Sequence, residues 1–247
     1  ISQYPSKSQY KDIISDYLNL NEVAKNWKKT QTKINSDKKV RFFKTHNMLV
    51  GHQDNFFTDY TNTLASIYII RDPRNVITSL KHHFSLDYNK SKEFLFNENQ
   101  IITLSDHEKE ETMGKKDHQL PQIIGSWQLH YRSWKSMKKN FLLIKYENLI
   151  KNPKEEFFKI SFFVEKILKT KFTEEQINNA IESSSFLKLK KMEDDYGFAE
   201  SAENKKGGKK NFFNLGPKND WTKLLDKKIA DEIASKFEDE MKELGYL

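Results

Sequence analysis

The stretch SIYIIRDPRNVITSL, residues Ser66–Leu80, decides the fold. Its first part, Ser66–Arg71, is apolar almost throughout, which is typical of a strand covered on both faces of a parallel sheet. Asp72 is a residue type that caps helices, and Pro73 suits the first helical position. The stretch therefore predicts a buried strand that passes directly into a helix over Pro73–Phe84.

Arg71 and Ser79 make this transition a candidate phosphate site. Open parallel sheets bind ligands beyond the carboxyl ends of their strands, and a helix N-terminus offers N–H groups to an anion. Arg71 ends the strand and supplies a planar cation that matches phosphate oxygens. Ser79 lies one helical turn beyond Asn75, within reach of the same anion. The alternative interpretation is that Arg71 forms a surface ion pair and Ser79 has no ligand.

Two more apolar runs predict strands, Val40–Lys44 and Phe141–Lys145. Apolar residues at helical spacing predict further helices, namely Asp12–Leu20, Asn21–Lys33, Pro121–Lys138, Pro153–Ile167, Phe172–Glu182 and Lys227–Leu244. Strands that alternate with helices indicate a three-layer α/β fold, with a central, mostly parallel sheet flanked by helices, in a single domain over residues 1–247. The polar stretches Leu86–Gln119 and Glu193–Asn211 are expected to be loops.

The composition excludes several chemistries. The chain of 247 residues has no cysteine, which excludes disulfides, thiolate metal sites and a cysteine nucleophile, and fits a cytoplasmic location. The seven histidines show no metal-ligand spacing, and no apolar run is long enough to span a membrane. The net charge of +7 favours an anionic partner. The 35 acidic residues are interspersed among the basic ones, which argues against nucleic acid as that partner.

Lys44-Thr45-His46 stands at the end of the first predicted strand. If the strands are parallel, these side chains lie on the same rim as Arg71. A neutral imidazole at His46 is suited to accept a proton from a substrate hydroxyl, since its unperturbed pKa lies near neutral pH. Lys44 is suited to stabilise charge that develops on a leaving phosphate.

Six blocks along the chain resemble the sulfotransferases that use 3′-phosphoadenosine 5′-phosphosulfate, and they occur in the order found in that family. They are RFFKTH (Arg41–His46), IYIIRDPRNVITSL (Ile67–Leu80), GSWQLHYRSW (Gly125–Trp134), FLLIKYENL (Phe141–Leu149), SSFLKLKKME (Ser184–Glu193) and FFNLGPKNDW (Phe212–Trp221). The resemblance implies a P-loop-type fold. It also implies transfer of a sulfuryl group to an acceptor hydroxyl or amine, without a metal.

The resemblance also implies roles for individual residues. His46 resembles the general base, and Lys44 the lysine beside the transferred group. Arg71 and Ser79 are similar to the pair that holds the 3′-phosphate. The remaining nucleotide contacts implied in this way are Tyr146 and Phe186 at the adenine, Ser184 near the nucleotide, and Gly216 through its backbone N–H.

Three features depart from the family pattern. The N-terminal phosphate loop, a Lys-Ser-Gly-Thr-rich turn, is not found, so we expect the chain to start downstream of it. Asn214-Leu215-Gly216 stands where the family has Arg-Lys-Gly, which leaves two cations missing beside the 3′-phosphate; Lys209 and Lys210 are the nearest lysines before it. The dimer motif of cytosolic animal relatives is not matched after Trp221, so the oligomeric state stays open.

Two function classes therefore follow from the sequence. The first is an active sulfotransferase that takes a nucleotide donor and a small-molecule, lipid or carbohydrate acceptor. The second is a non-catalytic nucleotide-binding remnant or an inactive fragment, favoured by the missing loop and by Asn214-Leu215. The acceptor itself cannot be read from the sequence, because specificity is carried by loops.

Overall fold

The predicted strand-to-helix transition is present in the computed structural model. Strand β5 covers Ser66–Ile70, and helix α4 covers Pro73–His83. The Asp72 carboxylate accepts a hydrogen bond from the N–H of Arg74 at 2.9 Å, so it caps α4 as expected. Ile77 on α4 is fully buried, which contributes about 1.5 to 3 kcal/mol relative to an exposed side chain.

The structure describes residues 2–103, 120–198, 201–203 and 209–247. They divide into two units: Ile1–Ser66 with Asn97–Lys139, and Ile67–Phe96 with Asn140–Leu247. The expectation of a single domain stays a prediction.

The first unit contains short strands and helices around an aromatic core. Its elements are β1 (Ser2–Gln3), α1 (Lys7–Tyr10), α2 (Leu20–Lys25), α3 (Trp27–Ile34), η1 (Asn35–Asp37), β2 (Phe43–Lys44), β3 (Gly51–His52), β4 (Asn55–Phe56), β6 (Ile101–Ile102), β7 (Gln122–Ile123) and α7 (Trp127–Lys135). Strands β1 and β2 pair in parallel, whereas the β3–β4 and β6–β7 pairs are antiparallel. Tyr10 and Trp27 are fully buried.

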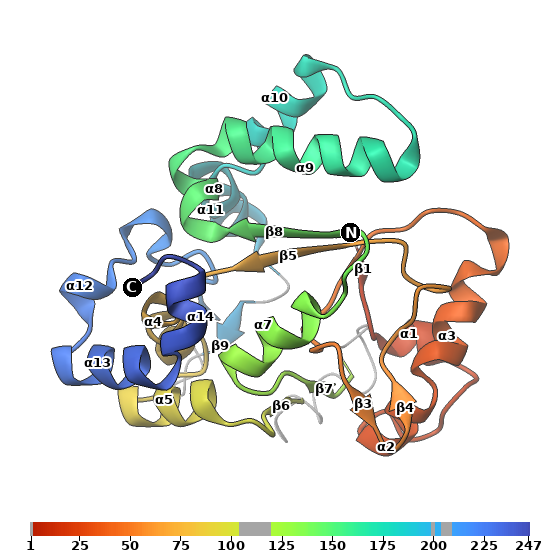
Figure 1. The fold of residues 1–247 in the computed structure, drawn as a ribbon, viewed down its shortest axis with the longest axis horizontal. Helices are drawn as coiled ribbons and strands as arrows, with labels where there is room; N and C mark the ends of the chain where they lie inside the picture. Colours follow the sequence, from red (N-terminus) through yellow and green to blue (C-terminus); the bar gives the residue numbers. More distant parts are fainter. Residues whose placement is uncertain (1, 104–119, 199–200, 204–208) are drawn as a thin grey trace. The chain divides into compact units, whose positions relative to one another are not determined.

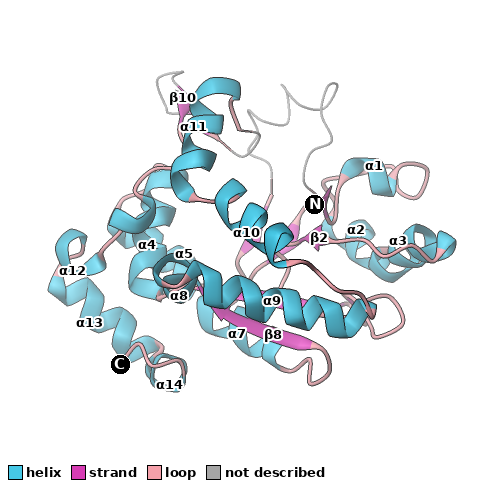
Figure 2. Cartoon of the chain, turned by 90° about the horizontal axis from the view of Figure 1, so that it is seen from above, coloured by secondary structure: helices cyan, strands magenta, loops and turns pink. Residues whose placement is uncertain are grey.

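The second unit holds the β5–β8 pair and most of the helices. Besides β5 and α4, its elements are α5 (Tyr88–Phe96), β8 (Phe141–Lys145), α8 (Tyr146–Lys151), α9 (Pro153–Leu168), α10 (Glu174–Ser183), α11 (Phe186–Tyr196), β9 (Ala202–Glu203), β10 (Lys209–Lys210), η2 (Gly216–Lys218), α12 (Trp221–Leu224), α13 (Lys227–Lys236) and α14 (Glu238–Glu243). Figure 1 draws β5 and β8 side by side and pointing the same way. Figure 2 shows α9 lying alongside β8, and α4 packs against α5 and α13.

Parallel strands flanked by helices confirm the predicted α/β class, but several predicted boundaries are wrong. No helix covers Asp12–Leu20, because the Asp16 side chain accepts from the N–H of Leu18 and Asn19 caps α2 instead. The helix predicted over Pro121–Lys138 begins only at Trp127, after the Ser126 cap.

Three further differences lie in the second half of the chain and around the predicted loops. The helix predicted over Lys227–Leu244 breaks at Phe237, whose buried ring packs edge-on against Phe96. Helix α5 and strand β6 occupy part of the predicted loop Leu86–Gln119, of which residues 104–119 lie outside the described residues. Within Glu193–Asn211, α11 extends to Tyr196 and β9 pairs with β10.

Candidate functional site

Arg71, Ser79 and Tyr146 come together in the second unit. Arg71 directly follows β5, and Tyr146 directly follows β8, so the parallel strands bring the two residues to the same edge. Arg71 Nη1 donates a hydrogen bond to Ser79 Oγ at 3.2 Å, and its guanidinium carbon lies 4.4 Å from the centre of the Tyr146 ring. The three side chains thus combine a cation, a hydroxyl and an aromatic face.

The cation at Arg71 is half-buried and remains charged. Burial lowers the pKa of Arg71 from its ordinary value, whereas the nearby Tyr146 and Glu147 side chains act in the opposite direction. A guanidinium stays protonated in proteins across the physiological range. Partial burial also makes its interaction with an anion stronger than at an exposed surface.

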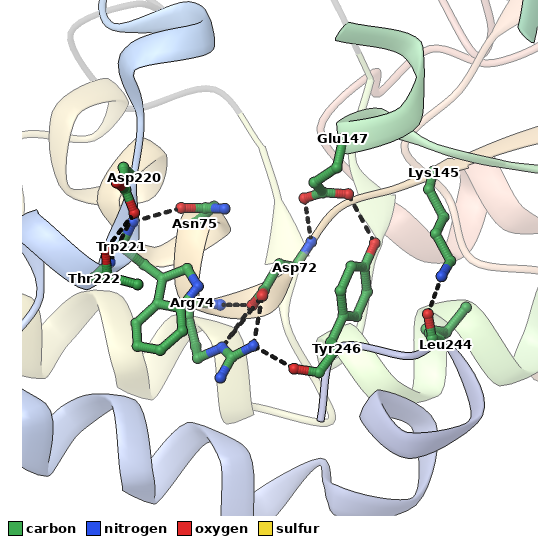
Figure 3. Close-up of polar contacts among 10 residues, drawn as sticks. All are labelled: Asp72, Arg74, Asn75, Lys145, Glu147, Asp220, Trp221, Thr222, Leu244 and Tyr246. Carbon is green, nitrogen blue, oxygen red and sulfur yellow. Dashed lines mark hydrogen bonds and ion pairs between the residues drawn. The ribbon is translucent and has the colours of Figure 1, made fainter. Parts of the chain in front are cut away.

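Glu147, which follows Tyr146, forms hydrogen bonds with Asp72, which follows Arg71, and with Tyr246 (Figure 3). Its Oε1 accepts from the N–H of Asp72 at 2.9 Å, and its Oε2 accepts from the Tyr246 hydroxyl at 3.0 Å. Burial, with the adjacent Glu147 carboxylate, raises the pKa of Tyr246, so the phenol keeps the proton that it donates. Glu147 therefore fixes the end of β5 relative to the start of α8.

Arg74 forms a second set of contacts beside this one. It makes a buried ion pair with Asp72 at 2.7 Å, and it donates to the backbone carbonyl of Tyr246 at 2.7 Å. Its guanidinium carbon lies 4.0 Å from the centre of the Trp221 ring, and the N–H of Trp221 donates to Asn75 Oδ1 at 2.9 Å (Figure 3). These contacts hold the first turn of α4, whose backbone N–H groups at Arg74, Asn75 and Val76 are bonded to Asp72.

Asn219 belongs to the same cluster, and sequence reasoning missed it. Its Nδ2 donates to Ser79 Oγ at 3.2 Å and to the carbonyl of Asn75 at 3.1 Å, while its Oδ1 accepts from the Thr78 hydroxyl at 2.6 Å. Its backbone N–H donates to the carbonyl of Gly216 at 3.1 Å. Asn219 therefore joins α4 to the turn at Gly216. No local pattern marks it, because each side-chain partner is about 140 residues away.

Phe186 and Gly216 are also in direct contact. Gly216 has a φ of +52°, and a Cβ added there would lie only 2.2 Å from Cε2 of the Phe186 ring. Phe186 opens α11, and its ring packs edge-on against Phe213 with centroids 6.2 Å apart. Glycine is thus required at this position both by conformation and by space.

Replacing Gly216 with alanine should lower stability and weaken nucleotide binding. The added methyl group forces the Phe186 ring to move, which we expect to cost about 1 to 3 kcal/mol in thermal unfolding. Gly245→Ala is the matched control, since its φ is +66° but the nearest atom to the added Cβ, Lys145 Nζ, is 3.6 Å away. An equal loss of stability in the two variants would show that the Phe186 contact is unimportant.

Glu193 holds the segment that leads to Gly216. Its buried carboxylate accepts from the N–H groups of Phe212 at 2.6 Å and Phe213 at 2.8 Å, and from the Ser201 hydroxyl at 2.5 Å. Burial favours the neutral carboxyl, but these hydrogen bonds outweigh it and hold the pKa of Glu193 below its usual value. Lys190 Nζ donates to the carbonyl of Phe213 at 3.1 Å.

Ser184 and the residues that stand in place of the family's Arg-Lys pair lie on other segments than Arg71 and Ser79. Ser184 is exposed at the end of α10, and its hydroxyl donates to the carbonyl of Ala180 at 2.7 Å. Asn214 is exposed and Leu215 is half-buried, just before Gly216. Lys210 Nζ donates to Ser85 Oγ at 3.1 Å, at the end of α4, while the side chain of Lys209 lies outside the described residues.

Lys44 and His46 belong to the first unit. Lys44 is the last residue of β2, and its carbonyl accepts from the N–H of Tyr4 at 2.8 Å. His46 follows two residues later and is half-buried. Its N–H donates to Gln122 Oε1 at 2.8 Å, and its carbonyl is bound by His130 Nε2 at 3.2 Å.

In this α/β protein, a cation at the end of β5, a hydroxyl on α4 and an aromatic ring directly after β8 lie together. A family model described as the sulfotransferase domain matches residues 4–245. The chain therefore belongs to the sulfotransferase family. The match covers both units.

Individual relatives agree with this assignment. The 3-beta-hydroxysteroid sulfotransferase of Cavia porcellus is 32% identical over 163 residues, which are 64% of this chain and 48% of the relative. The chain thus spans about half the length of that curated relative.

Solved structures with a similar fold are described as complexes with the nucleotide PAP. Retinol dehydratase in complex with retinol and PAP is 21% identical, covers 83% of this chain and 54% of its own, and has a TM-score of 0.55. Retinol dehydratase in complex with androsterone and inactive cofactor PAP is 20% identical, covers 96% of this chain and 65% of its own, and has a TM-score of 0.56. A mouse sulfotransferase complexed with PAP is 18% identical, covers 85% of this chain and 69% of its own, and has a TM-score of 0.52. These likenesses establish the fold.

Proposed function

We propose that the protein transfers a sulfuryl group from 3′-phosphoadenosine 5′-phosphosulfate to an acceptor hydroxyl or amine, and releases adenosine 3′,5′-bisphosphate. The observation that carries the proposal is the cluster of Arg71, Ser79 and Tyr146 in a chain of the sulfotransferase family. Its similarity to proteins described with bound PAP supports the same nucleotide.

The side chains of the second unit fit such a nucleotide. Arg71 and Ser79 would hold the 3′-phosphate through the guanidinium and the hydroxyl, which lie 3.2 Å apart. The rings of Tyr146 and Phe186 would line the adenine, and Gly216, which lies against the Phe186 ring, would offer its N–H to the phosphate. We assign Ser184 to the outer edge of this site, since its hydroxyl is exposed.

The first unit would supply the groups that act on the acceptor. The donor, when bound, supplies the sulfuryl group. His46 would take the proton from the acceptor hydroxyl as the new oxygen–sulfur bond forms and the bond between sulfur and the phosphate oxygen breaks. Lys44 would stabilise the negative charge left on the phosphate. The protein forms no covalent bond in this scheme, so positioning and charge dominate its contribution.

The names of the relatives support one acceptor class as the first to test. One is a hydroxysteroid sulfotransferase, and two structures are described with retinol or androsterone. We therefore propose an apolar alcohol as the first acceptor to test. Among the described residues, no helix combines the length and hydropathy needed to cross a bilayer. The cytoplasmic location stays a prediction that rests on the lack of cysteine.

A transfer assay with radiolabelled donor tests the proposal. Full-length protein is incubated with the donor and with separate sterol, retinoid, phenol, carbohydrate and amine acceptors, and binding of adenosine 3′,5′-bisphosphate is measured by calorimetry. We expect nucleotide binding and label transfer to at least one acceptor. Nucleotide binding without transfer would favour the non-catalytic alternative, which Asn214-Leu215 suggests, and absence of both would overturn the nucleotide site itself.

A further inference from the structure

The backbone around His46 is held from both sides by side chains distant in the sequence. Gln122 Oε1 accepts from the N–H of His46 at 2.8 Å and from the Thr45 hydroxyl at 3.1 Å. On the other side, His130 Nε2 lies 3.2 Å from the carbonyl oxygen of His46. A carbonyl oxygen only accepts hydrogen bonds, so Nε2 of His130 carries the proton. Both peptide groups that flank the His46 Cα are therefore fixed.

The neighbouring residues are held in the same way. Asn47 is fully buried, and its Oδ1 accepts from the N–H of Ile123 at 2.8 Å. Its carbonyl accepts from Trp134 Nε1 at 2.9 Å, and the N–H of Leu49 donates to Ser133 Oγ at 2.9 Å. Strand β7 and helix α7 thus bind the segment after β2 through side chains.

Gln122 is an unusual residue for a merely structural position. Its side chain is fully buried, and burying an amide is unfavourable unless it forms hydrogen bonds. Its oxygen bonds to His46 and Thr45, whereas its buried Nε2 has no hydrogen-bond partner among the residues that the structure describes. An apolar side chain of the same size would bury without this cost, but would leave the N–H of His46 without its acceptor.

We propose that Gln122 and His130 are positioning residues for His46. Gln122 binds the backbone N–H of His46 and His130 binds its carbonyl, so the His46 side chain is attached to a main chain that is held in place. This inference rests on the proposed role of His46 as the base. Misplacing a reacting group by about 1 Å can lower a rate by about 100-fold, so holding its backbone in place has a large effect on turnover.

The surroundings of His130 are consistent with this role. Removal from water lowers the pKa of His130 to about 4, although its hydrogen bond to the His46 carbonyl acts in the opposite direction. The ring is therefore neutral near pH 7. It binds the carbonyl without adding a second positive charge beside His46, where such a charge would oppose uptake of a proton.

Gln122→Leu tests the proposal with Gln31→Leu as its matched control. Gln31 is also a buried glutamine of the first unit, and it bonds to the Phe57 carbonyl at 2.7 Å and to the Thr58 hydroxyl at 2.6 Å, away from His46. We expect Gln122→Leu to lower kcat by about tenfold or more with the donor KM nearly unchanged. Gln31→Leu, compared at the same folded fraction, should keep kcat within about twofold.

His130 provides an independent pair of variants. His130→Gln keeps an N–H donor for the His46 carbonyl, whereas His130→Leu does not. We expect His130→Leu to lose kcat and His130→Gln to recover most of it, at similar thermal stability. The proposal is overturned if Gln122→Leu behaves like Gln31→Leu, or if the two His130 variants have equal kcat. If His46→Ala itself retains turnover, it is instead the proposed base that is wrong.

Discussion

Replacing His46 with alanine should lower turnover by about 10²- to 10⁴-fold, the range typical of a lost general base, while binding of adenosine 3′,5′-bisphosphate stays nearly unchanged. The separation is expected because the proposed contacts to the 3′-phosphate and the adenine come from the second unit, whereas His46 belongs to the first. Steady-state turnover with labelled donor and calorimetric titration with the bisphosphate measure the two effects on one protein preparation.

His52→Ala is the control for this variant. His52 lies in the first unit on β3, where its Nε2 contacts Asn21 Oδ1 at 2.7 Å, so its removal deletes an imidazole at a position with no proposed part in transfer. Turnover of His52→Ala should match that of the parent protein. Should His46→Ala keep the parent turnover, another group must remove the acceptor proton.

Replacing Arg71 with alanine should raise the dissociation constant of adenosine 3′,5′-bisphosphate by more than tenfold, or about 1.4 kcal/mol. The variant removes the half-buried cation together with its hydrogen bond to Ser79 and its stacking on Tyr146. Arg71→Lys should fall between alanine and the parent, since lysine keeps the charge but loses the planar fork and the stack. Titration calorimetry at one fixed salt concentration measures all three proteins.

Arg41→Ala separates this effect from a change in net charge. Arg41 pairs with exposed Asp37 at 2.6 Å in the first unit, so its loss changes the net charge of the protein equally. We expect the affinity of Arg41→Ala to equal that of the parent. An Arg71→Ala protein that binds the nucleotide with parental affinity would refute the phosphate site at the start of α4.

The sequence is informative where local chemistry determines the structure. Strands β5 and β8 and helix α4 agree with their predicted ranges to within one residue at each end, because apolar runs and an Asp-Pro cap act over a few neighbouring residues. The same local rules fail over Asp12–Leu20, where the Asp16 side chain binds the backbone in a turn, and at Phe237, where a buried ring interrupts a helical pattern.

In the site, too, some residues can be predicted from local sequence, whereas others depend on distant contacts. Arg71, Ser79 and Tyr146 can be proposed from strand ends and from family motifs, and the structure brings them into contact. Asn219 lies within a family block, but neither it nor Gln122 is singled out by local chemistry, because their importance comes from partners some 76 to 140 residues away. A single sequence carries no signal for such contacts when the residue has no special local role.

The anchoring of residues 212–216 bears on release of the proposed nucleotide product. Glu193 and Lys190, both on α11, bind the backbone of Phe213 from either side, and Phe186 on the same helix packs against Gly216. The turn is thus linked to α11 by hydrogen bonds and by ring packing. Any motion that opens the turn must either break the hydrogen bonds of Phe212 and Phe213 to Glu193 or carry α11 along with it. The nucleotide exchange rate would then depend on movement of a whole helix rather than of a short loop.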